Sequence, residues 1–416
     1  MERLIFHVDV NSAFLSWESA RRVREGTGED LRGIPAVISG DPRRRTSVVL
    51  AKSIPAKRFG IRTGEPISMA LRKCPELAVA APDFSLYQRC SRAFKDICRS
   101  YAPAVEEFSI DELFMDMSGT RLIYPDPVRT AHEIRERIRE ELGFTVNIGI
   151  APNKLLAKMA SDFEKPDRVH TLFAEEIPDK LWPLPVGELF SVGAATAGRL
   201  RSANVRTIGD LARMRAEDVR RLIGAKGGQQ IWEYANGIDD SPVAQTPREA
   251  KGYSISTTFE EDLTGYEAAE QILRHLVDCV AAKLRRDGFR TDCIGVSVRS
   301  WTFQNRSHQQ KLYNPTDITD EIYTVSKTLL HELWDGRLPL RLMGVSLTGI
   351  THDTFEQMTL FDGGGETREK QRKVDAAMDA IRERFGSASV VRGSTMKGDR
   401  RIGRKYEAQM EDSREE

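Results

Sequence analysis

Apolar and polar positions along the first third of the chain follow two periods. Residues 3–10, RLIFHVDV, and 144–151, FTVNIGIA, are short runs rich in apolar and β-branched residues, which predicts strands. Residues 129–143, RTAHEIRERIREELG, repeat apolar positions every three or four residues and end on glycine, which predicts an amphipathic helix. A second helix is predicted over 153–165, NKLLAKMASDFEK, just before Pro166. This mixture predicts an α+β layer rather than a Rossmann fold.

The character of the pattern changes along the chain and divides it into five segments. Residues 1–170 form the first α+β segment, and 171–238 read as short helices broken by glycines. Residues 239–250 are polar and contain proline, which predicts a linker. A second α+β unit is expected over 251–352. Residues 353–416 hold a short apolar motif, a charged helix and a tail.

Composition excludes several classes of protein. Hydrophobic residues make up 40% of 416, which is enough for packed cores and excludes wholesale disorder. We expect no signal peptide and no membrane span, because no apolar run reaches the roughly 20 residues that a span needs. The five cysteines are scattered without metal-ligand spacing, which is typical of reduced thiols in a cytoplasmic protein. Lys+Arg and Asp+Glu are both 62, so a nucleic-acid binder would have to segregate its charges locally.

Three carboxylates are the candidate chemistry. The stretch EFSIDELFMDM, 107–117, predicts a hairpin with strands 108–110 and 113–117 and with Asp111 and Glu112 at its tip. Asp9 ends the first predicted strand. If these strands are neighbours, the carboxylates converge, and such oxygen ligands suit Mg²⁺; a pair of these ions can activate an attacking hydroxyl and stabilise a leaving pyrophosphate. The alternative is an exposed hairpin tip in water.

Four sequence blocks decide between these readings. HVDVNSAFLSWE (7–18) together with FSIDELFMD (108–116) resembles the Y-family DNA polymerases, the translesion enzymes of the DinB and UmuC type. AKRFGIRTGEPI (56–67) and GIAPNKLLAKMASDFEKPD (149–167) match the same family in the same order, and the resemblance covers roughly residues 1–395.

The resemblance implies an α+β, right-hand polymerase. Palm and fingers would occupy 1–170 (fingers about 30–80), a helical thumb 171–238, and a separate α+β little finger domain, a DNA-binding domain, 251–352. The implied function is template-directed, low-fidelity DNA synthesis from dNTPs on primer–template DNA, with lesion bypass in DNA repair. A cytoplasmic monomer without membrane contact is expected.

The resemblance also implies roles for single residues. Asp9, Asp111 and Glu112 would hold two Mg²⁺ ions, with Glu112 on the ion that activates the primer 3′-hydroxyl. Phe14 matches the steric gate that excludes ribonucleotides; the alternative is an ordinary core phenylalanine at a helix start. Lys165 matches the lysine that reaches the incoming triphosphate, although a solvated lysine would also suit this helix end.

The fingers block departs from the DinB pattern. In SIPAKRFG, Ile54 replaces a tyrosine and Lys57 replaces an arginine, so that Lys57 can contact phosphate only as a point charge. LAKS, 50–53, is more similar to the UmuC branch and implies that Lys52 lies near the nascent base pair.

Two further segments are candidates for DNA contact. Residues 189–212 resemble a helix-hairpin-helix, whose hairpin Ser191, Val192 and Gly193 would offer backbone N–H groups to phosphates; the alternative is a small helical bundle with glycine caps. In the little finger, Arg299, Arg306 and Lys311 could follow a phosphate backbone along one strand face, which could equally be a solvated face.

The short apolar motif resembles a peptide that binds the bacterial sliding clamp. In QMTLF, 357–361, Gln357 would bond to backbone while Leu360 and Phe361 fill an apolar pocket. The alternative is a stray apolar patch on the preceding domain. 353–416 would therefore contain the clamp-binding peptide, followed by the C-terminal helix and tail.

Two other functions are alternatives to a polymerase. A non-catalytic, clamp-tethered DNA-binding accessory protein on the same scaffold would be expected to lack a carboxylate, and all three are present. Another palm-type nucleotidyl transferase, such as a cyclase, has no need of the thumb, little finger and clamp peptide.

Overall fold

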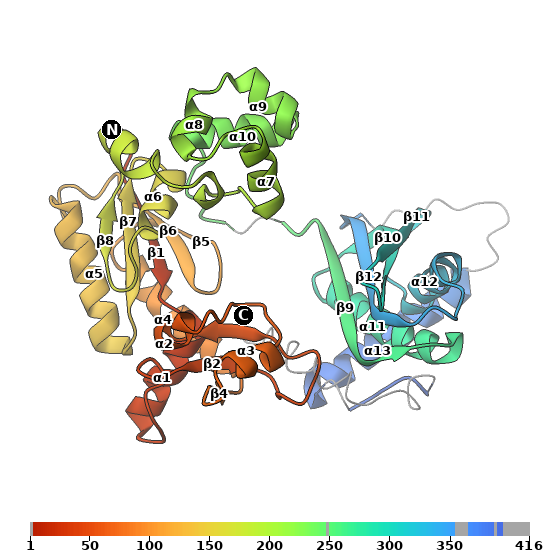
Figure 1. Cartoon of the computed structure of the whole chain (residues 1–416). Helices are drawn as coiled ribbons and strands as arrows, with labels where there is room; N and C mark the ends of the chain where they lie inside the picture. Colours follow the sequence, from red (N-terminus) through yellow and green to blue (C-terminus); the bar gives the residue numbers. More distant parts are fainter. Residues whose placement is uncertain (1–2, 247–248, 354–364, 387–388, 394–416) are drawn as a thin grey trace. The chain divides into compact units, whose positions relative to one another are not determined.

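The computed structural model describes residues 3–246, 249–353, 365–386 and 389–393. Figure 1 traces the chain, which divides into two compact units, Met1–Arg43 with Ser47–Pro247 and Arg44–Thr46 with Arg248–Glu416. Both units combine sheets and helices, so the expected α+β class is confirmed. Within the described part of the chain, no helix is long and apolar enough to cross a membrane.

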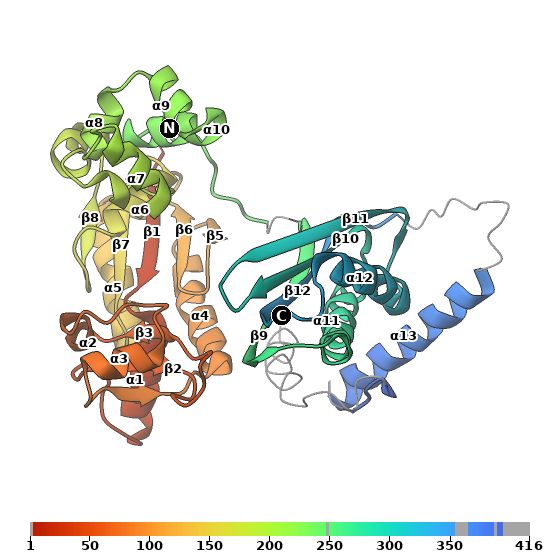
Figure 2. The ribbon, with the colours of Figure 1, turned by 45° about the vertical axis from the view of Figure 1, so that its right-hand side comes forward.

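A five-stranded sheet forms the centre of the first unit, in the order β5-β6-β1-β7-β8 (Figure 2). Its strands are β1 (Ile5–Val10), β5 (Ala104–Glu107), β6 (Glu112–Asp116), β7 (Val146–Ala151) and β8 (Val169–Thr171). The central strand β1 pairs antiparallel with both β6 and β7, while β7 and β8 run parallel. This order makes the end of β1 a neighbour of the start of β6.

Side chains alternate along β1, which gives the strand one buried apolar face and one face with polar residues. Phe6, Val8 and Val10 are buried in a core with residues of α1 (Ala13–Glu25), α4 (Phe84–Arg99) and α5 (Pro127–Leu142). Because successive side chains on a strand point to opposite sides, His7 and Asp9 lie on the other face, together with Ile5. Ile5 packs there against α6 (Lys154–Ser161).

The hairpin that brings Glu112 to this face is shifted from its expected position. The expected strands were 108–110 and 113–117, but β5 ends at Glu107 and β6 starts at Glu112. Phe108 and Ser109 donate their backbone N–H groups to the Glu112 carbonyl, so 108–111 form the turn. The Ser109 hydroxyl also donates to Asp111 Oδ1 at 2.6 Å within this turn. Glu112 is therefore a strand residue rather than part of the tip.

Two smaller subdomains complete the first unit. One is a sheet in the order β3-β2-β4 with its own core, built from β2 (Ala36–Ser39), β3 (Val49–Lys52), β4 (Ala78–Ala80), α2 (Ile54–Arg58) and α3 (Ile67–Lys73). The other is helical and shares a core with α6; it contains short helical turns at Ala174–Glu176, Ile177–Leu181 and Val186–Glu188, then α7 (Ala194–Ser202), α8 (Ile208–Arg213), α9 (Ala216–Ile223) and α10 (Ala225–Ala235).

The second unit is a four-stranded antiparallel sheet in the order β11-β10-β12-β9 with helices on one face. Its elements are β9 (Gly252–Leu263), α11 (Tyr266–Arg286), β10 (Arg290–Ser300), β11 (Asn305–Thr316), α12 (Thr319–Leu333) and β12 (Leu340–Thr351). Helix α13 (Gly365–Phe385) belongs to the same unit. Its buried Asp375 pairs with Arg285 of α11 and with Arg392, while Arg382 pairs with Asp278 of α11.

Candidate active site

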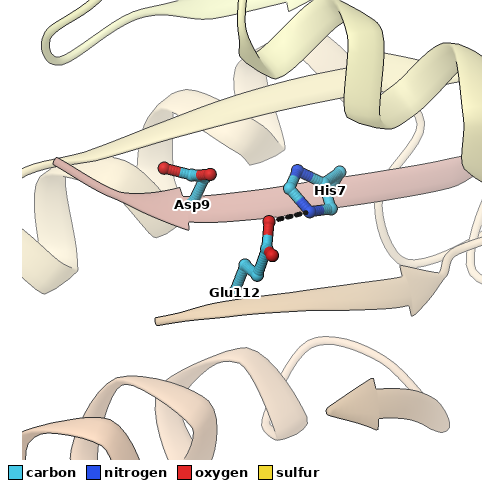
Figure 3. Close-up of side chains that lie close together, drawn as sticks. All are labelled: His7, Asp9 and Glu112. Atoms are coloured by element: carbon cyan, nitrogen blue, oxygen red, sulfur yellow. Dashed lines mark ion pairs between the residues drawn. The ribbon is translucent and has the colours of Figure 1, made fainter. Parts of the chain in front are cut away.

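Three side chains on the polar face of the first sheet converge in one cluster. One ligand atom each from His7, Asp9 and Glu112 lies within 4.8 Å of the others (Figure 3). His7 and Asp9 share a face of β1, and Asp9 stands directly opposite Glu112 in the pairing of β1 with β6. Two of the three predicted carboxylates are thus brought together by strand register.

Two lysines neutralise this pair of carboxylates. Lys158 of α6 places its Nζ 3.1 Å from Asp9 Oδ2 and 2.7 Å from Glu112 Oε2. Lys165 places its Nζ 2.9 Å from Asp9 Oδ1 and 2.8 Å from Asp162 Oδ1. Although burial favours the neutral acid, the nearby His7 ring and the Lys158 ammonium group, which donates a hydrogen bond, outweigh it and lower the pKa of Glu112 to about 2. Glu112 is therefore ionised at neutral pH.

Gly149 allows α6 to approach the sheet closely enough to supply Lys158. It lies on β7 opposite His7, and a Cβ there would stand 2.0 Å from the Ala157 carbonyl oxygen and 2.5 Å from the Ser161 nitrogen. No larger residue fits without moving the helix. The start of α6 is fixed by the Asn153 side chain, which accepts the Leu156 N–H at 2.9 Å.

His7 is the member of the cluster that was not assigned a role from sequence. Its side chain is fully buried, with Nδ1 2.7 Å from the Ser161 hydroxyl oxygen and Nε2 3.2 Å from Glu112 Oε2. Burial lowers the pKa of His7, so the ring is neutral at pH 7. The available signal was its spacing of two residues from Asp9, which puts both on one strand face.

Asp111 lies beside the cluster rather than within it. Its carbonyl accepts the Val10 N–H at 2.9 Å, which ties the turn to the end of β1. The half-buried Asp111 carboxylate accepts the Ser109 hydroxyl instead of meeting the atoms of His7, Asp9 and Glu112. The structure therefore brings Asp9 and Glu112 together directly and places Asp111 next to them.

The donor set fits a hard divalent cation. Carboxylate oxygens are the ligands that Mg²⁺ prefers, and adjacent carboxylates that share a site need positive charge between them. Here the Lys158 ammonium group contacts both Asp9 and Glu112, so the oxygens already converge on one cation.

Phe14, at the start of α1, is held by aromatic neighbours from α4. Its ring stacks on Tyr87 with centroids 4.4 Å apart and an interplanar angle of 6°. The Phe84 ring contacts the Phe14 ring edge-on, with 6.2 Å between the two ring centroids. The Tyr87 ring is itself fully buried, so it is a rigid backing for Phe14.

The other predicted nucleotide-binding lysines belong to the β3-β2-β4 subdomain. Lys52 ends β3 and contacts the Thr63 hydroxyl at 3.3 Å, while Lys57 is exposed on α2. Burial and then the charge of Lys57 lower the pKa of Lys52.

The predicted hairpin at Ser191, Val192 and Gly193 is the loop before α7. Val192 is buried and anchors it, whereas Ser191 adopts φ 72. Gly193 is the N-cap residue, and no side chain caps the helix. The first N–H groups of α7 are thus not used by a capping side chain.

The three basic residues of the second unit do not share one strand face. Arg306 pairs with Val298, whose side chain faces the helices, while Lys311 pairs with Cys293 on the opposite face. Arg299 shares the face of Lys311, because it is separated from Cys293 by an even number of residues. The expectation of a single face is therefore wrong for Arg306. The clamp-like motif with Gln357, Leu360 and Phe361 lies outside the described residues.

Comparisons with known proteins agree with this architecture. Family models match residues 8–162 (impB/mucB/samB family), 187–239 (DNA polymerase-iota, thumb domain) and 250–360 (impB/mucB/samB family C-terminal domain). A solved Y-family DNA polymerase chimera superposes with a TM-score of 0.72 over 84% of this chain and 100% of that one, at 22% identity. This likeness confirms the polymerase fold.

Curated bacterial relatives are similar over nearly their whole length. DNA polymerase IV of Clostridium acetobutylicum is 42% identical, over 94% of this chain and 98% of that protein. DNA polymerase IV 1 of Bacillus subtilis is 34% identical, over 95% and 94%. The chain therefore belongs to the impB/mucB/samB family, the Y-family of DNA polymerases, and is of the bacterial DinB type.

Proposed function

We propose that this chain extends a primer on template DNA from dNTPs, as a translesion polymerase whose reaction takes place at Asp9, Asp111 and Glu112. Its membership of the DNA polymerase IV group supports a DNA-directed DNA polymerase. The observation that carries the site assignment is the pairing of Asp9 with Glu112 across β1 and β6, with the Lys158 ammonium group between them.

Asp9, Asp111 and Glu112 would hold two Mg²⁺ ions. Bound there, the ions would neutralise phosphate charge and lower the pKa of the primer 3′-hydroxyl. Lys165 contacts Asp9 and Asp162, and its long side chain would reach the incoming triphosphate.

Other residues would select and hold the nucleotide and the DNA. The Phe14 ring, backed by Tyr87, would exclude a 2′-hydroxyl by steric clash. Lys52 and Lys57 would contact the nucleotide from the fingers, about residues 30–80. The loop Ser191, Val192 and Gly193 would bind phosphate through backbone N–H groups of a thumb spanning 171–238.

In the little finger, which we place at 251–352 after a linker at 239–250, Arg299 and Lys311 share the sheet face without helices. We propose that they contact the DNA backbone there. Arg306 lies on the opposite face of the sheet and is not part of this proposed contact.

Primer extension with Mg²⁺ and four dNTPs tests the central proposal, on intact and abasic templates. Asp9→Asn, Asp111→Asn and Glu112→Gln are each expected to lower the rate at least about 100-fold, with primer–template binding preserved. Asp116→Asn, on the same strand β6 but outside the cluster, is the matched control. Wild-type rates in the first three variants would refute the site. DNA binding without extension by the wild type would favour the accessory-protein alternative.

The sliding clamp is the proposed partner, through residues 357–361. Deletion of this peptide should abolish stimulation by the clamp and leave clamp-free extension unchanged. If the clamp still stimulates extension after the deletion, residues 357–361 are not the clamp-binding peptide. We place the enzyme in the cytoplasm. We also expect it to be a monomer, and sedimentation at micromolar concentration would test this oligomeric state.

A further inference from the structure

Two bonds of Ser161 fix the position of the hydrogen on the His7 ring. The Ser161 hydroxyl donates its one hydrogen to the Lys158 carbonyl oxygen at 2.8 Å. The hydroxyl oxygen, 2.7 Å from His7 Nδ1, therefore accepts the Nδ1 hydrogen. Because the ring is fully buried and neutral, its second nitrogen, Nε2, carries a lone pair instead of a hydrogen.

The lone pair on His7 Nε2 faces the carboxylate cluster. Nε2 has no hydrogen-bond partner among the described residues. The atom that it approaches is Glu112 Oε2, at 3.2 Å, which is also an acceptor (Figure 3). A buried polar atom without a partner costs about 1–3 kcal/mol, and a bound ion is one of the groups that can satisfy it. A single cation between Nε2 and Oε2 would satisfy both acceptors.

The ligand atoms around this lone pair suit zinc. One atom each from His7, Asp9 and Glu112 lies within 4.8 Å of the others. Tetrahedral Zn²⁺ with ligands at about 2.0–2.2 Å holds these ligands about 3.3–3.6 Å apart, which is close to the 3.2 Å between Nε2 and Oε2. Imidazole is a common zinc ligand, whereas Mg²⁺ takes oxygen ligands. Three protein ligands leave a fourth position of the tetrahedron open.

We propose that His7, Asp9 and Glu112 form a Zn²⁺ site, and that zinc bound there keeps Mg²⁺ away from the two carboxylates. The zinc binding rests on the geometry of the three side chains, whereas the inhibition rests on the proposed role of Asp9 and Glu112 in the polymerase reaction. Zinc would take the place of the Lys158 ammonium group at these carboxylates. Lys158 Nζ also lies 3.3 Å from Asp162 Oδ2, which keeps the displaced ammonium group paired.

A second pair of residues has to be separated from this site. In α11, Cys279 Sγ lies 3.6 Å from His275 Nε2, and thiolate and imidazole both bind zinc. Zinc held by this pair would be an adventitious ion only. His275→Asn is therefore the matched control for His7→Asn, because each variant removes one imidazole.

The test measures zinc binding and zinc inhibition in the full chain after EDTA has removed bound metals. The Kd for Zn²⁺ comes from competition with a chromophoric chelator. The inhibition constant comes from primer extension at fixed Mg²⁺, relative to the rate of each variant without zinc. We expect His7→Asn to raise both constants at least about 100-fold, beyond the roughly 10–100-fold that loss of an outer-shell partner costs. His275→Asn should behave as wild type, and added Mg²⁺ should relieve the inhibition of the wild type.

If His7→Asn does not fold, His7→Phe takes its place. Phenylalanine keeps a ring beside Phe114, whose centroid lies 4.6 Å from that of His7, and it offers no lone pair. Zinc binding should weaken to the same extent. X-ray absorption of the wild type with one equivalent of Zn²⁺ is an independent readout, for which we expect nitrogen and oxygen neighbours with one imidazole. A sulfur neighbour at about 2.3 Å would assign the zinc to the Cys279 pair and overturn the inference.

Failure of this inference differs from failure of the proposed function. Wild-type zinc affinity in His7→Asn and His7→Phe would make the zinc an adventitious ion only, even if Glu112→Gln is inactive in extension. If zinc binding depends on His7 but bound zinc does not slow the wild type, the inhibition is refuted. In that case Asp9 and Glu112 are not the Mg²⁺ ligands of the reaction, and the zinc site alone stands.

Discussion

Asp9 and Glu112 stand opposite each other on the neighbouring strands β1 and β6, and the ammonium group of Lys158 bridges their carboxylates at 3.1 and 2.7 Å. Both carboxylates are largely buried, with 16% and 15% of their side chains exposed. At this burial neither charge is well solvated, so the pair depends on a cation, whether that cation is a lysine or a metal ion.

Replacing Lys158 by methionine should make stability depend on added Mg²⁺. Without the ammonium group, Asp9 and Glu112 repel each other, and we expect a loss on the order of 3 kcal/mol. Because Mg²⁺ binding favours the folded state, millimolar Mg²⁺ should raise the Tm of Lys158→Met more than that of wild type. Thermal melts with EDTA and with Mg²⁺ measure this. Lys180→Met, which breaks the more exposed pair with Glu176, is the control and should change stability by less than about 1 kcal/mol. Equal Mg²⁺ responses in wild type and Lys158→Met would contradict the prediction.

Phe14→Ala should admit ribonucleotides. Removing the ring that stacks on Tyr87 opens the space for a 2′-hydroxyl, and we expect the preference for dNTPs over rNTPs to fall on the order of 100-fold. Single-nucleotide incorporation with matched dNTP and rNTP measures the ratio. Phe59→Ala, an exposed phenylalanine of the β3-β2-β4 subdomain, should leave it unchanged. If Phe14→Ala discriminates between dNTPs and rNTPs as strongly as wild type, Phe14 is not the steric gate.

Gly149→Ala should destabilise the first unit and lower activity together. The added methyl group would overlap the Ala157 carbonyl oxygen and the Ser161 nitrogen, so α6 must move away and take Lys158 with it. We expect a cost of about 1–3 kcal/mol. Gly198→Ala on α7 is the matched control, since nothing lies within 4 Å of its added Cβ and alanine favours helices. The Tm and the extension rate are measured for both variants. If Gly149→Ala has the Tm of wild type, α6 is not packed as tightly on β7 as the structure indicates.

The cap of α8 should lose strength in acid. Backbone N–H groups of Thr207 and Arg206 bind the Asp210 carboxylate and lower its pKa to about 2, against an ordinary value of 3.8. A depressed folded-state pKa stabilises the helix above about pH 4, and this stabilisation is lost as the pH falls toward 2. Asp210→Asn removes the charge from the first turn of α8 and should therefore speed amide exchange in α8 at pH 7, equivalent to roughly 0.3–1 kcal/mol.

The difference between Asp210→Asn and wild type should shrink as the pH approaches 3. Amide exchange of the α8 peptide, corrected for intrinsic rates at each pH, follows this directly. A peptide from α10, measured in the same samples, serves as an internal reference. Among the described residues, no hydrogen bond of Asp210 reaches α10. A difference independent of pH would show that the charge of Asp210 is not what caps the helix.

Local sequence pattern predicted several helices and strands and located the carboxylates of the proposed site. Helical periodicity predicted 129–143 and 153–165, and the structure has α5 at Pro127–Leu142 and α6 at Lys154–Ser161. Local periodicity is a property of neighbouring residues, so it can be read without the fold. The carboxylates Asp9 and Glu112 were identified because strand ends and family blocks are also local features.

The surroundings of these carboxylates depend on contacts between residues far apart in the chain. Lys158 is 149 residues from Asp9 in the chain, and His7 meets Ser161 across 154 residues. Neither pairing has a sequence signature, because each depends on how closely α6 packs on Gly149. Arg306 and Lys311 lie five residues apart on β11, so alternation along this strand puts them on opposite faces once the strand bounds are known. The hairpin at 104–116 also differs from its expected position, because residues 108–111 form a turn that is closed by backbone bonds to the Glu112 carbonyl and contains the Ser109–Asp111 bond.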